Sequence, residues 1–384
     1  MSHNWLLPEH IEDVLPAAAW RMEQVRRDIL DLFWRHGYEF VQPPLLEYLE
    51  SLLTGTGHDL GLKTFKLVDQ LSGRHMGIRA DITPQAARID AHLMNRKGVN
   101  RLCYCGSVLH TLPDGMMGSR EPIQIGLELF GHAGLESDLE IQSLMVEALG
   151  LAGVNEILID LGHVAIFRAI VSPHERAMAR EGDLFQALQN KDTQRLADLT
   201  ADLDRATAQA LCALPELNGA AAVLDRATKI LPKHPQISAA LQDLRKLGEL
   251  LEQRSIKVSY DLAELRGYHY HSGIVFAAYA KGYADPVAKG GRYDEVGKSF
   301  GRARPATGFS IDLRQVLANG VPSANLGILA PYESGAELQH KIDELRHTGE
   351  RVVIELPGAP ADASDLGCNR RLTLKKGVWQ VITI

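Results

Sequence analysis

Glu-Leu-Arg-Gly-Tyr-His-Tyr, at residues 264–270, and Gly-Gly-Arg-Tyr-Asp, at residues 290–294, are the two segments that decide how this chain folds. We interpret them as a strand, a loop and a second strand. They bring a planar guanidinium, two phenol rings and a glycine-lined backbone toward one place. The sequence therefore predicts a binding pocket that is built on a β-sheet.

The composition is that of an ordinary globular protein, because 45% of the 384 residues are hydrophobic and 23% are charged. A chain of this length can bury a large core, and we expect one big domain and something smaller. The formal net charge of −7 argues against nucleic acid as the main partner, although it leaves room for a local basic groove. No apolar run approaches the roughly 18 residues of a membrane span, and no secretion signal is apparent, so we expect a cytoplasmic protein without a membrane partner.

The cysteines are too few and too scattered for a disulfide framework. Cys103 and Cys105 fall on one face of a predicted strand at 101–106. A metal pair is an alternative there, but no second Cys or His pair follows at the spacing of a zinc site. His269 and His271 also have strand spacing, without a nearby third ligand. We therefore expect buried thiols and no metal or other cofactor.

Helical and strand-like segments alternate along the first part of the chain. Helices are predicted at 18–36 and 136–149, where apolar residues recur at helical spacing. The predicted strands are 38–42, 65–69, 76–79, 100–108 and 122–130. This alternation of helices with antiparallel hairpins predicts an α+β domain and not a doubly wound parallel sheet.

The next part of the chain changes character. Residues from 174 to about 254 have a pattern of helices only, which we interpret as a helical insertion between two halves of one sheet. Strand-like sequence resumes at 256–262, and the sheet continues through 274–279 and Arg292. A helix from 308 toward 317 is expected to close this domain.

A linker predicted at 320–323 divides the chain into a large domain, 1–320, and a small α/β module, 321–384. The predicted elements of the module are strands at 326–330, 352–356, 371–374 and 378–384 and a helix at 335–347.

From about residue 8 to residue 317, the order of these segments resembles the catalytic domain of class II aminoacyl-tRNA synthetases, specifically the histidyl type. Residues 264–270 and 290–294 are similar to that family's Arg-Gly-Leu-Asp-Tyr-Tyr and Gly-Gly-Arg-Tyr-Asp runs, which recognise histidine. The resemblance implies an antiparallel sheet flanked by helices. Residues 11–16 are similar to the family's Asp-x-Leu-Pro segment. The helix predicted at 18–36, followed by residues 40–44, is similar to its first motif, which forms a dimer interface. We therefore expect a homodimeric core.

The resemblance implies a histidine-binding pocket. Arg-Ala-Asp-Ile-Thr at 79–83 stands where the family has Arg-Pro-Glu-Gly-Thr, so Asp81 and Thr83 are expected to hold the α-ammonium group. Gln124 and Glu128 keep the family's Gln and Glu at the same spacing. Because side chains alternate along a strand, these two share one face and can reach one ligand. Glu128 is expected to accept a hydrogen bond from an imidazole N–H.

The second half of the predicted pocket comes from the two segments quoted first. The resemblance implies that Arg266 binds the carboxylate of the ligand. Tyr270 and Tyr293 are expected to enclose the ring and to hydrogen-bond to it. His271 replaces a tyrosine of the family pattern, which bears on the affinity and the pH dependence of the site.

The residues that a synthetase uses for ATP match poorly. Leu-His-Thr-Leu at 109–112 stands where the family has Phe-Arg-x-Glu, although Arg120 matches a later arginine of that motif. Asp-Leu-Arg-Gln at 312–315 stands where the family has Gly-Leu-Glu-Arg, so Gln315 replaces the arginine that contacts the γ-phosphate. The transition state of a phosphoryl-type transfer such as adenylation depends on positively charged side chains beside the phosphates. We therefore expect no adenylation activity and no catalytic residues.

The C-terminal module is shorter than the anticodon-binding domain of a synthetase and has few basic pairs, so we expect no tRNA partner. This combination resembles the family of ATP phosphoribosyltransferase regulatory subunits. The resemblance implies a non-catalytic protein that pairs with a short-form catalytic subunit, as a hetero-octamer, in the first step of histidine biosynthesis and under inhibition by histidine. Two alternatives stay open: a true histidyl-tRNA synthetase and a free-standing histidine-binding paralogue.

Overall fold

The computed structural model describes residues 5–54, 58–115, 118–265, 267, 270–318, 326–358 and 362–384. The chain divides into two compact units, of which the larger contains Met22–Gly320 and the smaller contains Val321–Ile384. The linker predicted at 320–323 lies outside the described residues, so the domain boundary stays a prediction.

The larger unit is built on a nine-stranded sheet in the order β1-β5-β6-β12-β11-β10-β7-β9-β8. Its strands are β1 (Glu39–Phe40), β5 (Asn100–Ser107), β6 (Ile123–Phe130), β7 (Leu158–His163), β8 (Asn218–Gly219), β9 (Lys257–Asp261), β10 (Ile274–Tyr279), β11 (Ala288–Arg292) and β12 (Ala306–Asp312). Neighbours from β5 to β7 in this order are antiparallel, whereas β1 and β9 run parallel to their inner neighbours. The predicted α+β class with an antiparallel sheet is confirmed.

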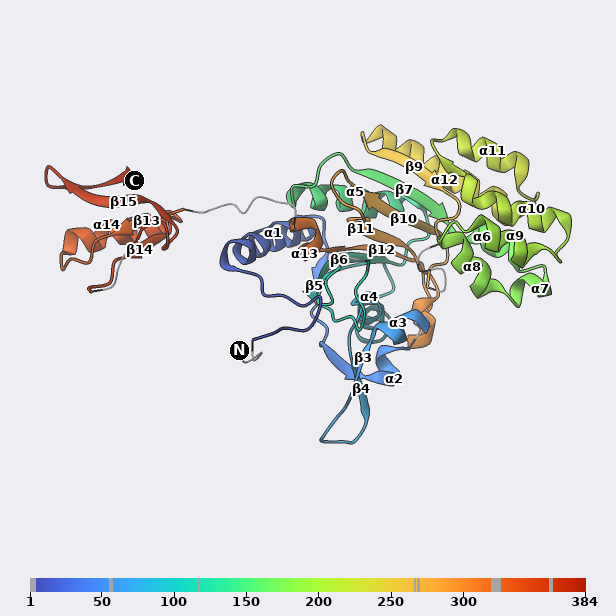
Figure 1. The fold of residues 1–384 in the computed structure, drawn as a ribbon, viewed down its shortest axis with the longest axis horizontal. Helices are drawn as coiled ribbons and strands as arrows, with labels where there is room; N and C mark the ends of the chain where they lie inside the picture. The colour runs from blue at the N-terminus through green and yellow to red at the C-terminus, as the bar shows by residue number, and fades with distance from the viewer. Residues whose placement is uncertain are drawn as a thin grey trace. The chain divides into compact units, whose positions relative to one another are not determined.

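Helices cover both faces of this sheet (Figure 1). On the face that we call the rear face, α1 (Pro16–Arg35) and α5 (Leu135–Leu151) form a common core with the sheet. The ring of Phe33 on α1, for example, lies 6.1 Å from that of Phe309 on β12. On the front face lie α4 (Thr83–Arg88) and the π-helix η1 (Ile89–Met94).

A smaller three-stranded sheet in the order β2-β4-β3 belongs to the same unit. It consists of β2 (Leu46–Tyr48), β4 (His75–Ile78) and β3 (Phe65–Val68), with the short helices α2 (Leu49–Leu52) and α3 (His58–Lys63) in the same stretch of chain. β3 and β4 form the hairpin that the alternating sequence predicted, which is therefore confirmed.

The helical insertion gathers at one end of the large sheet (Figure 1). Its helices and those that flank it are α6 (Val164–Val171), α7 (Glu175–Met178), α8 (Glu181–Gln189), α9 (Thr193–Thr200), α10 (Arg205–Ala213), the 3-10 helix η2 (Leu214–Glu216), α11 (Ala222–Ile230) and α12 (Pro235–Gln253). The prediction of helices only is wrong at one point, because the two-residue strand β8 lies in this region and pairs with β9.

Two other predictions of secondary structure are wrong. Residues 306–312 form β12, and the helix that was expected from 308 begins only after them, as α13 (Leu313–Leu317). β12 pairs with β6 on one side and β11 on the other, so it is held as a strand from both sides. Residues 264–270 are not a strand where they are described, because Gly267 adopts a left-handed φ of 67° and starts a turn. The 3-10 helix η3 (Val296–Phe300) completes this unit.

The smaller unit has a four-stranded sheet in the order β14-β13-β15-β16. Its strands are β13 (Gly327–Ala330), β14 (Val352–Ile354), β15 (Cys368–Lys375) and β16 (Val378–Thr383), and its helix is α14 (Ala336–His347). Ile328, Leu338, Ile342 and Leu372 form its small core. The α/β elements predicted for this module are confirmed within the described residues.

Candidate functional site

Glu128 lies at the centre of the front face. Its side chain is 1% exposed. Oε1 accepts a hydrogen bond from the Tyr104 hydroxyl at 3.0 Å, and Oε2 accepts one from the Tyr293 hydroxyl. In the part of the chain that the structure describes, this carboxylate has no cationic partner. A buried carboxylate without a cation is unfavourable, so this group is suited to receive a ligand that carries N–H donors.

Glycines make room for this carboxylate. Gly308 of β12 lies directly opposite Glu128 of β6, and Gly291 of β11 lies opposite Gly308. A Cβ atom at Gly308 would overlap the Glu128 carboxylate, and one at Gly126 would lie 2.8 Å from the Tyr104 hydroxyl. The glycines therefore leave the room on the front face that the side chains of Glu128 and Tyr104 occupy, and we call this region around Glu128 the trough. The sequence analysis missed Gly308 and Tyr104, because their positions beside Glu128 depend on how neighbouring strands pair, which no local pattern shows.

Three predicted residues meet beside Glu128. Gln124 donates from Nε2 to Asp81 Oδ1 at 2.7 Å and accepts the Ile82 backbone N–H at 2.9 Å. The same Asp81 oxygen accepts the Thr83 backbone N–H at 3.0 Å, and the Thr83 hydroxyl lies 3.0 Å from that of Tyr104. Asp81 Oδ2 has no hydrogen-bond partner among the described residues. One carboxylate oxygen is therefore held in place while the other is available to an ammonium group.

Aromatic rings close the other side of the trough. The ring centroids of Tyr270 and Tyr293 are 5.0 Å apart, and His271 packs edge-on against Tyr270 at 5.5 Å. The Tyr270 hydroxyl is buried and has no hydrogen-bond partner in the described structure. The His271 ring fits between Gly267 and Gly291, where a Cβ atom would approach it to within 3 Å. Burial lowers the pKa of His271 to about 4, so its ring is neutral.

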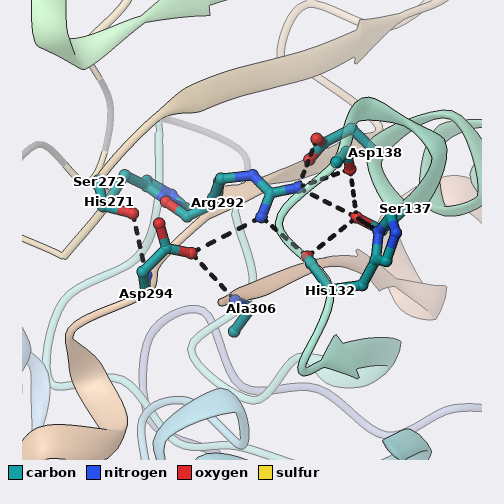
Figure 2. Close-up of polar contacts among 9 residues, drawn as sticks. His132, Ser137, Asp138, His271, Ser272, Arg292, Asp294 and Ala306 are labelled. Carbon is teal, nitrogen blue, oxygen red and sulfur yellow. Dashed lines mark hydrogen bonds and ion pairs between the residues drawn. The ribbon is translucent and has the colours of Figure 1, made fainter. Parts of the chain in front are cut away.

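Arg266, the predicted ligand for the carboxylate, lies outside the described residues, and its role stays a prediction. Arg292 does not face this trough. Its guanidinium points to the rear face, where it forms a 2.6 Å ion pair with Asp138 of α5 and a 3.0 Å hydrogen bond to Ser137 Oγ (Figure 2). Arg292 is therefore a structural arginine that fixes the end of β11, and the adjacent Tyr293 supplies the group on the front face.

Comparison with known proteins shows to which family the chain belongs. A family model of histidyl-tRNA synthetase matches residues 10–316, and a model of the ATP phosphoribosyltransferase subunit HisZ C-terminal domain matches residues 324–382. The chain is 54% identical over 380 residues to an ATP phosphoribosyltransferase regulatory subunit of Methylobacillus flagellatus, covering 99% of this chain and 98% of that protein. It is also 54% identical to one of Cupriavidus taiwanensis, with full coverage of both. The chain belongs to the family of ATP phosphoribosyltransferase regulatory subunits.

Solved structures agree with this family. A protein from Bacillus halodurans, described as an ATP phosphoribosyltransferase regulatory subunit/histidyl-tRNA synthetase, is 27% identical, with a TM-score of 0.82 and coverage of 95% of this chain and 96% of that chain. A histidyl-tRNA synthetase from a Nostoc species is 17% identical, with a TM-score of 0.77 and coverage of 100% and 97%, and it shows the fold alone. The predicted synthetase-like fold of this chain is thus confirmed.

The residues that the sequence analysis matched to the second motif of a synthetase hold no free cation within the described part of the chain. His110 is buried, its Nε2 lies 2.9 Å from the Ala80 carbonyl oxygen, and its Nδ1 has no partner in the described part of the chain. Arg120 donates from Nε to the His110 carbonyl at 3.1 Å and lies over the ring of Phe65. Both side chains are therefore engaged within the protein.

The positions that correspond to the third motif are also engaged. Asp312 Oδ1 accepts the Arg314 backbone N–H at 3.0 Å and caps the start of α13. Gln315 donates from Nε2 to the Pro286 carbonyl at 3.3 Å, and Arg314 forms an ion pair with Glu121 at 3.3 Å. Asp312 therefore serves as a helix cap, a role that the sequence analysis did not foresee.

The described residues were compared with two other kinds of feature, a metal site and a membrane-spanning helix. In the described ranges, no group of three or more His, Cys, Asp and Glu side chains is arranged to hold a metal ion. Of the helices that the structure describes, none is both long and apolar enough to cross a membrane.

The protonation of Glu128 makes the fold sensitive to pH. Burial raises its pKa from the ordinary 4.5 to about 8, although hydroxyl donors, with Tyr293 first, act in the opposite direction. A carboxyl whose pKa is higher in the folded protein stabilises the fold fully below its unfolded pKa. That contribution is lost as the pH rises toward 8.

We expect the free energy of unfolding of the natural protein to fall between pH 5 and pH 8 by about 3 kcal/mol more than that of Glu128→Gln. Denaturant titrations of both proteins at the two pH values measure the difference, and the comparison cancels the other titrating groups. An equal pH dependence in the two proteins would show that Glu128 does not titrate in this range.

Proposed function

We propose that this protein is a non-catalytic regulatory subunit that binds histidine in the trough around Glu128. It activates a short-form ATP phosphoribosyltransferase catalytic subunit in the first step of histidine biosynthesis and mediates feedback inhibition by histidine. The observation that carries the proposal is the buried Glu128 carboxylate, which lacks a cation among the described residues and faces the unpaired Tyr270 hydroxyl across the trough. Burial favours the neutral form of Glu128 in the empty site, and an imidazolium ring supplies the charge that stabilises its carboxylate.

The arrangement fits the rest of a histidine molecule. Asp81, held by Gln124 and the Thr83 backbone, offers one free oxygen to the α-ammonium group. Arg266 is proposed to bind the carboxylate. His271 forms part of the wall and stays neutral, so it does not repel a cationic ligand.

The proposed absence of adenylation rests on the two motif positions already described. His110 is buried against the Ala80 carbonyl, and Gln315 carries no charge where a synthetase has an arginine. A neutral group cannot replace a fixed guanidinium beside polyphosphate, and the loss of one such donor costs several kcal/mol of transition-state stabilisation. Histidine is therefore retained as an effector and is not activated for transfer to tRNA.

We further propose that the protein acts in the cytoplasm as a homodimeric core within a hetero-octamer with the catalytic subunit. The names of the relatives support the pairing with ATP phosphoribosyltransferase. The homodimer is supported by Trp34 of α1 and Phe40 of β1, which are 70% and 47% exposed in the single chain and belong to the first-motif segment. Large apolar side chains at such exposure are typical of a protein interface.

The proposal is tested by the formation of phosphoribosyl-ATP by a short-form catalytic subunit, with and without this chain and across a histidine titration. We expect activity to rise severalfold when the chain is added and to fall again with histidine. A parallel assay of histidine-dependent ATP–pyrophosphate exchange is expected to give no signal. Absence of activation together with a positive exchange assay would identify a true synthetase instead.

A further inference from the structure

A cavity of about 430 Å³ lies behind the sheet, on the face opposite the histidine trough. Four regions meet there: the turn into α5, the middle of α12, the end of β7 and the adjoining ends of β10 and β11. Its lining includes Leu135, Glu136, His163, Asp243, Lys246 and Ile274. A volume of this size is within the range of small-molecule sites.

Three polar groups of the lining make no hydrogen bond among the described residues. The first is the Nε2 atom of His163, whose side chain is only 8% exposed. Its Nδ1 accepts the Ala165 backbone N–H at 3.2 Å, so the ring proton is on Nε2. His163 lines the cavity, and Nε2 is the ring nitrogen that is left for a ligand there. The others are the ammonium of Lys246, whose side chain is exposed, and the Asp243 carboxylate, one helical turn apart on α12. The charges of Arg292 and Lys246 both act on this carboxylate.

The local electrostatics favour an anion near His163. Burial lowers the pKa of His163 to about 4, and the charges of Arg292 and Arg168 act in the same direction, so the ring is a neutral N–H donor. Helix α5 starts at the cavity with Gly134 as its N-cap and without a side-chain cap. Its amide dipoles add positive potential there. Glu136 folds over Gly134 as an exposed carboxylate that can rotate away from the helix end.

We propose that this cavity is a second binding site, for a small anion that carries a carboxylate or phosphate group together with a hydroxyl or ammonium donor. The anionic group is bound by His163 Nε2–H and the Lys246 ammonium. The donor of the ligand is bound by Asp243. Ile274 and Leu135 form the apolar wall. The site is distinct from the histidine trough and does not depend on the proposed function.

The two sites are connected through the end of β11. Arg292 lines the rear cavity, and its backbone continues directly into Tyr293, whose hydroxyl binds Glu128 on the front face. Figure 2 shows how this junction is held: the Arg292 guanidinium lies between Asp138 and Ser137 on one side and Asp294 on the other, and Asp294 binds the backbone of Ala306. A ligand in the cavity therefore lies beside Arg292, the residue that precedes Tyr293 of the trough.

The test uses the full chain with selectively labelled histidine, so that the imidazole signals of its 15 histidines can be followed by NMR. Inorganic phosphate, acetate and lactate are titrated separately. We expect saturable shifts of the His163 signal, which is assigned by its loss in His163→Asn. Asparagine keeps a side-chain oxygen for the Ala165 N–H, so this variant is expected to fold. The affinities of phosphate and acetate show which of the two anionic groups the site prefers. Lactate is expected to bind more tightly than acetate because its hydroxyl reaches Asp243.

Lys246→Gln is expected to raise the half-saturating concentration of the anion by about tenfold, because the variant loses one charge-assisted contact. Lys233→Gln, which removes an exposed lysine outside the cavity, is the matched control and is expected to leave it unchanged. Histidine is added to saturation in a second series and is not expected to displace the anion. The proposal is overturned if none of the three anions shifts the His163 signal at tens of millimolar, or if Lys246→Gln binds as the natural protein does.

Discussion

Replacing Glu128 by glutamine is expected to weaken histidine binding by about a hundredfold, which corresponds to about 3 kcal/mol for a hydrogen bond to a charged group in a buried site. Glutamine has the same shape and can hydrogen-bond to Tyr104 and Tyr293, so the fold is expected to stay intact. It offers no charge to an imidazolium, and its amide nitrogen is a donor where the ligand also has donors. Isothermal titration calorimetry of histidine into the natural protein and the variant measures the change in affinity.

The control for this experiment is Glu147→Gln, which removes an exposed carboxylate from α5 on the other side of the sheet. It is expected to bind histidine with unchanged affinity. A comparable loss in both variants would point to a general effect of net charge. An unchanged affinity in Glu128→Gln would place the effector outside the trough.

Gly308→Ala is expected to have an equally large effect, for a steric reason. A methyl group at this position would overlap the Glu128 carboxylate and approach the Leu127 carbonyl oxygen to 2.6 Å. Because β12 is paired on both sides, its backbone cannot move away without loss of ladder hydrogen bonds. We expect a loss of about 3 kcal/mol in the free energy of unfolding and no measurable histidine binding. Denaturant titration and calorimetry measure the two effects.

Gly150→Ala is the matched control, because Gly150 lies within α5 and no atom stands within 4 Å of its Cβ position. Alanine there is expected to stabilise the protein by about 0.5–1 kcal/mol. The double variant Glu128→Ala with Gly308→Ala is expected to lose less stability than the sum of the two single changes, since the removal of the carboxylate relieves the overlap. Strict additivity would show that the two residues do not compete for the same space.

The sequence was sufficient to predict several neighbours of Glu128. The contacts that it did not predict were missed for physical reasons. Gln124 and Glu128 could be paired from the period of a strand alone. Tyr104 was missed because its contact with Glu128 depends on the register between β5 and β6, which no local pattern reveals. The direction of Arg292 was missed for a similar reason, since its partner Asp138 lies more than 150 residues earlier in the chain.

The two errors in secondary structure have different causes. Residues 306–312 contain Gly308 and Ser310, which are weak strand formers, and a helix does begin at Leu313. Pairing on both sides decides in favour of the strand, which is a case of tertiary structure overriding local propensity. Residues 264–270 contain two tyrosines, a residue type that is enriched in strands. Gly267, however, adopts a left-handed conformation, and the Tyr270 and His271 amides bond back to its carbonyl. Glycine allows this turn at no steric cost.

The most direct test of the central claim is a calorimetric titration of histidine into the isolated full-length chain near neutral pH. We predict saturable binding of one histidine per chain, unaffected by ATP, on the proposal that the amino-acid pocket is retained and that the ATP-binding cations are replaced. A folded protein that takes up no histidine at millimolar concentration, or one whose histidine binding is strengthened by ATP, would contradict it.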